Sequence, residues 1–304
     1  MSMPPEVSFS DFSRKFINGD EKFTQPEKKQ CLRDLQIMIA NLKNIPREQV
    51  LFSPDDLYLT HDELVIFNDM IARYINDEPV SKIIHQRFFW KHAFYVDENV
   101  LDPRPETELI IELMLKQFAT YLPLRFLDMG TGSGCILLSL LQEYENATGI
   151  GIDICPGAIA VAKRNRKMFP SSIAERAEFI IIDWNDLGKT QAAAHESHFH
   201  SFDVLVGNPP YIKSAEIEFL PKNVKNYDPR VALDGGQNGM TSFAEIASIA
   251  KKMLRPNGRI FLEIGIDQDA DVKKILQHNN FSSLNLFKDS NEIDRVISGT
   301  YISF

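Results

Sequence analysis

A glycine-rich segment between an apolar run and an amphipathic one constrains the fold of this chain most strongly. Arg125–Asp128 is predicted to form a buried strand, and residues 134–143 are predicted to form a helix. Between them lies Asp128-Met-Gly-Thr-Gly-Ser-Gly134. Glycine lets a backbone turn tightly and come close to a ligand. A strand, a tight turn and a helix in this order are typical of an α/β fold that binds its ligand at the carboxyl ends of parallel strands.

The alternation of strand and helix continues toward the C-terminus. Two late segments, 283–287 and 295–301, can close the sheet as an antiparallel pair. Strands that are separated by helices form a mostly parallel, doubly wound sheet. The predicted fold class is therefore α/β, with a seven-stranded sheet. The remaining predicted elements are strands over 148–153, 178–183, 202–207 and 259–263, and helices over 156–168, 241–254 and 269–278.

The N-terminal part has a different pattern. Apolar residues recur at helical spacing over Leu32–Leu42 and again over Leu64–Ile75, which predicts a small helical bundle. Ser53–Asp56 and Thr60–Glu63 have the composition of helix starts, and the second is a capping box. We expect this part to hold a partner and to contribute no chemistry of its own.

The pattern changes again between this bundle and the first strand of the sheet. Residues 87–100 are rich in aromatic and β-favouring side chains, which predicts a short hairpin. Two prolines then precede a helix that should begin near Glu106. We expect three parts: a helical substrate-binding domain over 1–86, a hairpin linker over 87–104 and a catalytic domain over 105–304.

The composition limits the partners and compartments that we expect. The 304 residues carry 33 Lys and Arg against 42 Asp and Glu, a net charge of −9. Proteins that wrap nucleic acid usually have a basic excess, so no direct nucleic-acid contact is expected. Apolar runs are too short to cross a bilayer, no secretory signal is visible, and Cys31, Cys135 and Cys155 are widely spaced. These features predict a cytoplasmic protein with reduced thiols and no membrane partner.

A polar segment over 189–201 contains His195, His198 and His200. Three histidines could be metal ligands, but the segment has no Cys or Asp and no partner segment of similar character. A solvated loop is therefore expected here, and no metal is predicted.

The spacing of the glycines distinguishes between cofactors. A dinucleotide fingerprint would need glycine at position 135, which is Cys135. The observed order, acid-x-G-x-G-x-G, resembles motif I of the class I (Rossmann-like) methyltransferases. That resemblance implies S-adenosylmethionine as the cofactor, which has no pyrophosphate to place on a helix N-terminus.

Acidic residues at strand ends support a nucleoside ligand. Asp153 closes the second strand, and a carboxylate suits the paired ribose hydroxyls because it only accepts hydrogen bonds. Asp183 is expected to accept from the adenine amino group with Trp184 beside the ring, and Asp128 to help hold the methionine ammonium. Each acid alone could instead be a solvated strand end or a helix cap. The expected cofactor-binding residues are Asp128, Gly130, Thr131, Gly132, Gly134, Asp153, Asp183, Trp184 and Asn208.

The segment Asn208-Pro-Pro-Tyr211 follows the fourth predicted strand. Its prolines lack backbone donors, so the main chain offers carbonyls only. A planar nitrogen is a poor nucleophile, and two acceptors, the Asn208 side-chain oxygen and the Pro209 carbonyl, can take its N–H groups and aim its lone pair at a methyl group. Tyr211 can pack against the flat acceptor. Asn208, Pro209 and Tyr211 are therefore the predicted catalytic residues, for either a carboxamide or an exocyclic base amine.

Residues from about 77 to 301 resemble the HemK/PrmC protein-glutamine methyltransferases, which modify the Gln of the Gly-Gly-Gln motif in class I peptide-chain release factors. The helical N-terminal part is similar to the helical substrate-binding domain of that family. The motifs that carry the resemblance are Val100–Glu108, Asp128–Gly134, Gly151–Asp153, Phe202–Ile212, Asp228–Gly236, Leu254–Gly258, Leu262–Gly265 and Asp294–Val296.

The resemblance implies that Asn208 and Pro209, with Pro210 and Tyr211, bind the substrate amide. It also implies that Arg104, Pro105 and Glu106 lie near the entrance for cofactor and substrate. Two positions depart from the family pattern: His85 stands where glycine is usual, and Asp228-Pro229 stands where Glu-Pro is usual.

Three alternatives stay open beside a release-factor substrate. One is a related enzyme that acts on a glutamine of a ribosomal protein, which the Pro103–Glu108 stretch disfavours. Another is a nucleic-acid methyltransferase that acts on an adenine or guanine amino group with the same Asn-Pro-Pro-aromatic chemistry. The last is a non-catalytic binding protein, which an intact Asn208 and an unbroken glycine loop disfavour.

Overall fold

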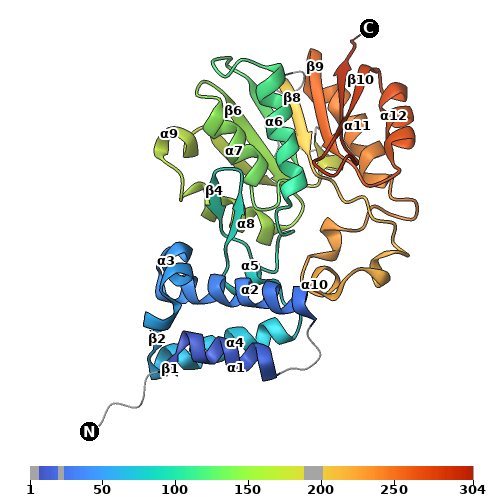
Figure 1. Cartoon of the computed structure of the whole chain (residues 1–304). Helices are drawn as coiled ribbons and strands as arrows, with labels where there is room; N and C mark the ends of the chain where they lie inside the picture. Colours follow the sequence, from blue (N-terminus) through green and yellow to red (C-terminus); the bar gives the residue numbers. More distant parts are fainter. Residues whose placement is uncertain (1–6, 20–23, 188–200, 304) are drawn as a thin grey trace. The chain divides into compact units, whose positions relative to one another are not determined.

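The computed structural model describes residues 7–19, 24–187 and 201–303. The chain divides into two compact units, Met1–His85 and Gln86–Phe304 (Figure 1). The segment with His195, His198 and His200 lies outside the described residues. Within the described ranges, the chain has no helix with the length and apolar character that crossing a membrane requires.

The smaller unit is a helical bundle. Its core is formed by fully buried side chains that include Leu35, Met38 and Phe67. Two strands of two residues each, which are too short to leave a pattern in the sequence, pair antiparallel beside the helices. The elements are β1 Val7–Ser8, α1 Phe9–Gly19, α2 Gln25–Lys43, α3 Arg47–Phe52, β2 Tyr58–Leu59, α4 His61–Ile75 and α5 Val80–Ile83.

The two predicted helix starts of this unit differ in outcome. The capping box at Thr60 is confirmed: its hydroxyl accepts from the Glu63 backbone N–H, and the Glu63 carboxylate accepts from the Thr60 N–H. The start predicted at Ser53 is wrong, because Pro54–Asp56 forms a single 3₁₀ turn and the chain then enters β2.

The larger unit begins with the predicted hairpin. It consists of β3 Arg87–Phe89 and β4 His92–Phe94, which pair antiparallel. The rings of Phe89 and Phe94 are fully buried, pack edge to face 6.1 Å apart, and belong to the core of this unit. The hairpin is therefore packed into the larger unit and is not a free connection.

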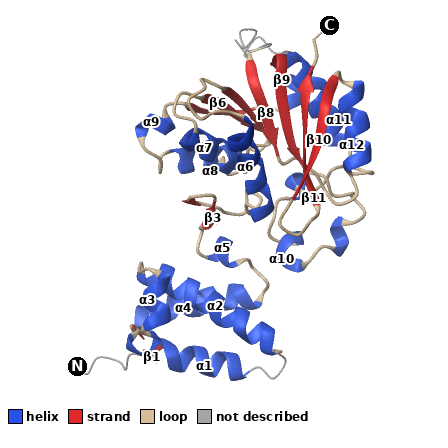
Figure 2. Ribbon diagram, turned by 45° about the horizontal axis from the view of Figure 1, so that its top comes forward, coloured by secondary structure: helices blue, strands red, loops and turns tan. Residues whose placement is uncertain are grey.

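A seven-stranded sheet forms the centre of the larger unit, as predicted (Figures 1 and 2). The strand order is β10-β11-β9-β8-β5-β6-β7, in which β5 to β9 run parallel and β11 pairs antiparallel with both β9 and β10. Chain order reverses at β5, which lies between β6 and β8. The bounds are β5 Arg125–Met129, β6 Thr148–Asp153, β7 Ala177–Ile181, β8 Phe202–Gly207, β9 Leu254–Glu263, β10 Phe281–Lys288 and β11 Asp294–Tyr301.

The pairing register of β5, β6 and β8 places the carboxyl ends of these three strands at the same edge of the sheet. Asp128 of β5 lies opposite Gly151 of β6 and Val206 of β8. The loops that follow these strands therefore leave the sheet at one edge, where an open α/β sheet binds ligands.

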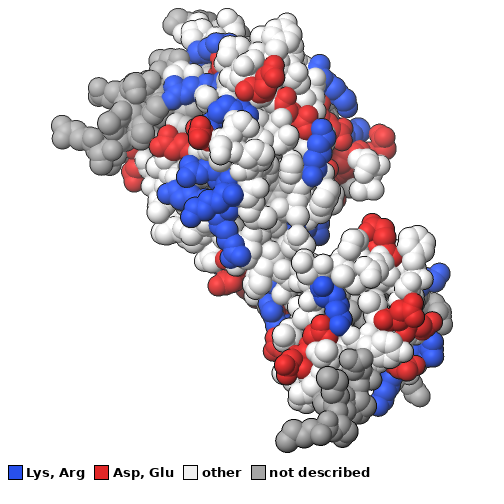
Figure 3. All heavy atoms as spheres, turned by 90° about the vertical axis from the view of Figure 1, so that its left-hand side faces the viewer, with Lys and Arg blue, Asp and Glu red and all other residues white. Residues whose placement is uncertain are grey.

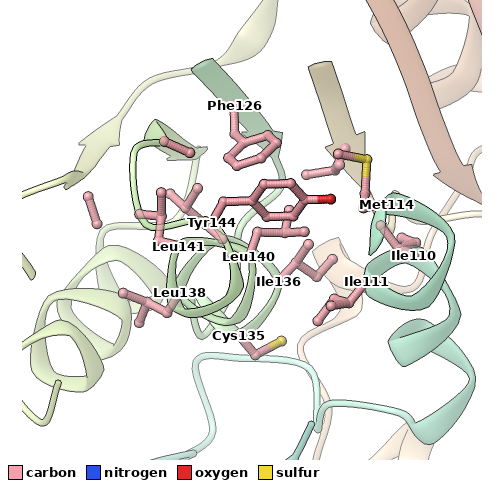
Figure 4. Packing of buried hydrophobic residues seen from close by; sticks show 14 of the residues in the cluster. Ile110, Ile111, Met114, Phe126, Cys135, Ile136, Leu138, Leu140, Leu141 and Tyr144 are labelled. Atoms are coloured by element: carbon pink, nitrogen blue, oxygen red, sulfur yellow. The ribbon is translucent and has the colours of Figure 1, made fainter. Parts of the chain in front are cut away.

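Helices cover both faces of the sheet, which explains why its strands are almost continuously apolar (Figure 2). On the first face, the Tyr144 ring packs edge to face on Phe126 at 5.5 Å, among leucines of α7 (Figure 4). Helices α6 Glu108–Gln117, α7 Cys135–Glu143 and α8 Pro156–Arg166 contribute to the core on that face, and α11 Thr241–Met253 and α12 Asp269–His278 to the core on the other.

Several predicted boundaries are wrong by a few residues, each for a local reason. Strand β7 ends at Ile181 because the Asp183 carboxylate caps a 3₁₀ turn, accepting from the Asn185 N–H at 2.8 Å. Strand β9 begins at Leu254, five residues early, because an irregularity in its pairing with β8 absorbs the Pro-Asn-Gly sequence. The helix expected near Glu106 begins as a 3₁₀ turn over Pro105–Thr107.

Phe126→Ala should destabilise the larger unit by about 3–5 kcal/mol, because the lost ring leaves a cavity against Tyr144. Urea unfolding followed by tryptophan fluorescence measures this unit alone, since the two tryptophans, Trp90 and Trp184, both lie in it. Phe88→Ala is the matched control: that ring is 67% exposed, and its loss should cost less than about 0.5 kcal/mol. Equal losses in both variants would contradict the assigned core.

Candidate functional site

A pocket of about 550 Å³ opens at the carboxyl edge of β5, β6 and β8. Its walls come from the glycine loop after β5, the segments after β6, β7 and β8, the stretch before α6, and the start of α11. Asp128, Gly134, Pro209, Tyr211 and Glu106 do not line the pocket. The predicted site residues that do line it are Arg104, Gly130, Thr131, Gly132, Asp153, Asp183, Trp184, Asn208 and Pro210.

The glycine loop has a backbone that only glycine adopts without strain. Gly130, Gly132 and Gly134 have φ angles of 71°, 53° and 79°, all in the left-handed region. The N–H groups of Gly130 and Thr131 both donate to the carbonyl of Ile152, at 3.0 and 2.9 Å. The loop is thus bonded to the end of β6 and fixed in shape.

Asp153 connects the glycine loop to the start of α8. One carboxylate oxygen accepts from the Gly132 N–H at 3.0 Å, and the other accepts from the Cys155 N–H at 2.9 Å. Burial raises the pKa of this carboxyl, and the backbone N–H groups oppose the shift. Because a carboxylate has about four acceptor positions, both oxygens can still accept from a ligand in the pocket.

Asp128 is fully buried beneath the same loop. Its Oδ2 accepts from the Thr131 hydroxyl at 2.6 Å, and burial raises its pKa to about 7. Thr131 lines the pocket, whereas Asp128 does not. The hydrogen bond between them therefore lets the buried Asp128 stabilise the glycine loop from inside the protein.

Trp184 and Ile154 give part of the pocket wall an apolar character. Both line the pocket, and Ile154 is 53% exposed although it is apolar. The Trp184 indole N–H donates to Glu245 Oε2 of α11 at 2.8 Å, which fixes the plane of the ring. Asp183 uses one oxygen to cap the 3₁₀ turn.

The Asn208–Tyr211 segment is held by its backbone. The Gln268 side chain donates to the carbonyl of Tyr211 at 2.9 Å and accepts from the Gly265 N–H at 2.8 Å. Gly235 passes so close that a Cβ there would lie 2.7 Å from the Tyr211 Cα. Asn208 and Pro210 line the pocket, while Pro209 is buried and Tyr211 is half-buried behind them.

Asn208 is linked by hydrogen bonds to two buried polar residues, Thr107 and Glu263. The Asn208 side-chain nitrogen donates to the Thr107 hydroxyl at 3.2 Å, and that hydroxyl donates to Glu263 Oε2 at 2.5 Å. The Tyr211 hydroxyl reaches Glu263 Oε1 at 3.4 Å. Burial raises the pKa of Glu263 to about 7, although the hydrogen bond from Thr107 and the charge of Arg295 lower it.

An ion pair holds Arg104 at the pocket wall. The guanidinium donates to Asp228 Oδ2 at 2.7 Å, and the Asp102 N–H donates to the other oxygen at 3.2 Å. The Asp228 side chain is 1% exposed. Asp228, which stands where the family usually has Glu, is therefore the buried partner that holds Arg104 in place. Glu106 is half-buried and does not line the pocket.

The sequence prediction did not assign Thr107, Glu245 or Glu263 to the site. Thr107 lies inside the Pro103–Glu108 stretch, so the family motif did contain a signal for it. Glu245 and Glu263 reach the site through contacts 61 and 156 positions apart in sequence, which no local pattern indicates.

Two features together indicate the class of enzyme. A glycine loop is bonded to an acid at the end of the next strand, and the doubly wound sheet closes with one antiparallel strand pair. The chain is an S-adenosylmethionine-dependent methyltransferase. A methyltransferase-domain family profile matches residues 123–298.

Relatives identify the family. The release factor glutamine methyltransferase of Caulobacter vibrioides is 36% identical over 88% of this chain and 88% of its own length. Proteins with that name from Rhodospirillum rubrum and Agrobacterium fabrum are 37% and 34% identical, over 87% and 88% of this chain and 77% and 89% of theirs. The chain belongs to the release factor glutamine methyltransferase family.

A solved structure supports the fold. The catalytic domain of hMettl16, crystallised in complex with the MAT2A 3'UTR hairpin 6, matches 80% of this chain and 83% of its own with a TM-score of 0.52. At 14% sequence identity, the likeness concerns the fold alone.

Glu263→Gln should change how stability depends on pH. A carboxyl whose pKa is raised from 4.5 to about 7 keeps its proton in the folded state and loses it in the unfolded state between these values. Wild-type stability therefore falls as pH rises through that window, on the order of 3 kcal/mol for this group. The uncharged variant lacks this loss.

The measurement is the difference in unfolding free energy between Glu263→Gln and wild type at pH 5 and at pH 8, by urea and tryptophan fluorescence. The difference should shift in favour of the variant at pH 8. Glu112→Gln, a 48% exposed side chain on α6, controls for the loss of one charge. A difference that is the same at both pH values would show that Glu263 is not a buried acid of raised pKa.

Proposed function

We propose that this enzyme methylates the side-chain amide nitrogen of the glutamine in the Gly-Gly-Gln motif of class I peptide-chain release factors. The observation that carries the proposal is the position of Asn208. Its side chain lines the pocket, and its nitrogen is already bonded to Thr107, which leaves the side-chain oxygen as an acceptor for a substrate N–H group.

The cofactor supplies an activated methyl group on a sulfonium. The pocket volume of about 550 Å³ is in the range of small-molecule sites, and its residues fit a nucleoside linked to an amino acid. In the proposal, Asp153 accepts from the ribose hydroxyls. The adenine lies near Ile154 and Trp184, with Asp183 as the acceptor for its amino group. Gly130–Gly134 follows the amino-acid part, with Asp128 acting on the ammonium through Thr131.

The residues of the chain activate and align the amide. A carboxamide nitrogen is a weak nucleophile because its lone pair is delocalised, and two acceptors on its N–H groups raise its electron density. In the proposal these acceptors are Asn208 Oδ1 and the Pro209 carbonyl. Tyr211 does not line the pocket, so it supports this segment from behind, with its hydroxyl near Glu263, and does not stack on the substrate. The nitrogen bonds to the methyl carbon, the carbon–sulfur bond breaks, and one amide proton passes to water. Alignment of this kind accounts for a large part of the rate in two-reactant enzymes.

The release-factor substrate is supported by the names of the relatives that cover most of this chain. The charge of −9 gives no electrostatic reason to bind nucleic acid. Figure 3 shows acidic and basic side chains interspersed over the face that it presents, with one compact group of basic side chains on the larger unit beside acidic ones. Methylation of an exocyclic base amine is the competing function, because it would use the same two acceptors.

The helical unit is proposed to hold the protein substrate. Leu51, Phe52 and Tyr58 are 47%, 85% and 47% exposed and follow each other closely in the chain. Exposed apolar side chains of this kind favour contact with a protein surface.

The function is tested by incubating the enzyme with methyl-labelled S-adenosylmethionine and either a class I release factor, its Gly-Gly-Gln→Gly-Gly-Ala variant, or DNA and RNA. Label should appear on the unaltered release factor only. Asn208→Ala should lower this transfer by about 10²-fold or more, because one acceptor of the transition state is lost, while cofactor affinity falls by much less than this. Label on nucleic acid alone would overturn the proposed substrate.

Asp153→Ala should weaken S-adenosylmethionine binding about 10- to 100-fold, because the ribose loses its acceptor and the Gly132 and Cys155 N–H groups lose theirs. Isothermal titration calorimetry measures the dissociation constant. Asp186→Ala is the control, because Asp186 is an exposed acid in the segment after β7 and does not line the pocket. This variant should bind the cofactor as wild type does. Wild-type affinity of Asp153→Ala would remove this residue from the cofactor site.

A further inference from the structure

Asn208 is the outermost member of a chain of hydrogen bonds that ends on a buried carboxylate. Thr107 and Glu263 are 3% and 1% exposed, so neither side chain can exchange its partners for solvent. The contacts run from Asn208 Nδ2 to Thr107 Oγ1 and on to Glu263 Oε2, over 3.2 and 2.5 Å. Three segments far apart in sequence therefore meet at the pocket wall: the stretch before α6 and the loop after β8, whose residues Thr107 and Asn208 line the pocket, and the end of β9.

The chemistry of these groups gives the chain a direction. At pH 8, above the raised pKa of about 7, the Glu263 carboxylate is ionised and only accepts, so the Thr107 hydroxyl gives its single proton to Glu263. The oxygen of that hydroxyl is then left as an acceptor, and the only Asn208 atom that can donate to it is Nδ2. An Asn208 amide rotated by 180° would place two acceptors, Oδ1 and the Thr107 oxygen, against each other.

We propose that Thr107 and Glu263 are positioning residues that fix which end of the Asn208 amide faces the substrate. They hold the nitrogen inward and the oxygen toward the pocket. A reversed amide would present two N–H groups to the N–H groups of the substrate nitrogen and would repel it. The buried pair thus selects the acceptor face of Asn208 before the substrate arrives.

This inference rests on the proposed role of Asn208, and a valine substitution separates the two. Thr107→Val keeps the shape of the side chain and removes the hydroxyl, so the Asn208 amide loses the contact that orients it. Thr107→Ser returns the hydroxyl and is the matched control. Assays run at pH 8 with methyl-labelled S-adenosylmethionine and the unaltered release factor, and calorimetry measures cofactor affinity in each variant.

Thr107→Val should lower kcat about 10- to 100-fold, which is the loss expected when a catalytic group is misplaced, while cofactor affinity changes by less than about twofold. Thr107→Ser should recover most of the rate. In an Asn208→Ala background, measured in single turnovers, Thr107→Val should have no further effect, because the group that it positions is gone.

The outcomes distinguish the two claims. A wild-type rate for Thr107→Val, with Asn208→Ala inactive, overturns the positioning role and leaves the proposed function standing. A full loss of rate by Thr107→Val in the Asn208→Ala background also overturns it, because Thr107 would then act by another route. A wild-type rate for Asn208→Ala removes the basis of both.

Discussion

The parallel pairing of β5 with β6 on one side and β8 on the other determines where everything else in the larger unit lies. Asp128 lies opposite both Gly151 and Val206, so the three strands end at the same level. A shift of one residue in this register would turn alternate side chains to the other face of the sheet and separate the glycine loop from Asp153. The pocket therefore exists because the backbone ladder is in register, and the side chains that line it are attached to a fixed edge.

Features that depend on neighbouring residues could be predicted from the sequence. The apolar strands, the glycine loop and the capping box at Thr60 each have a short-range signal, and the seven-stranded sheet follows from their alternation. Asp153 and Asn208 were predicted from different motifs, and both line one pocket. Their meeting required only that parallel strands end at the same edge.

Features that depend on distant residues could not be predicted in this way. Glu263 appears in the sequence as the last residue of a strand, and only folding brings it within 2.5 Å of Thr107, 156 positions away. Asp183 was placed at a strand end, but its carboxylate bonds the backbone two residues on and draws the chain out of the sheet. In both cases a carboxylate accepts a hydrogen bond from a group that would otherwise lack a partner, a buried hydroxyl for Glu263 and a backbone N–H in a turn for Asp183. These contacts depend on the folded structure and not on the local sequence pattern.

The rigid glycine loop has a consequence for how binding energy is used. Gly130, Gly132 and Gly134 have left-handed conformations, and hydrogen bonds to the end of β6 hold the loop in this shape. If this loop follows the amino-acid part of the cofactor, as proposed, a wall of fixed shape binds that part equally well before and after the methyl group has left. Such uniform binding lowers the concentration of cofactor that is needed but does not speed the chemical step. In the proposed function, the preference for the transition state then arises where the second reactant enters, around the amide of Asn208.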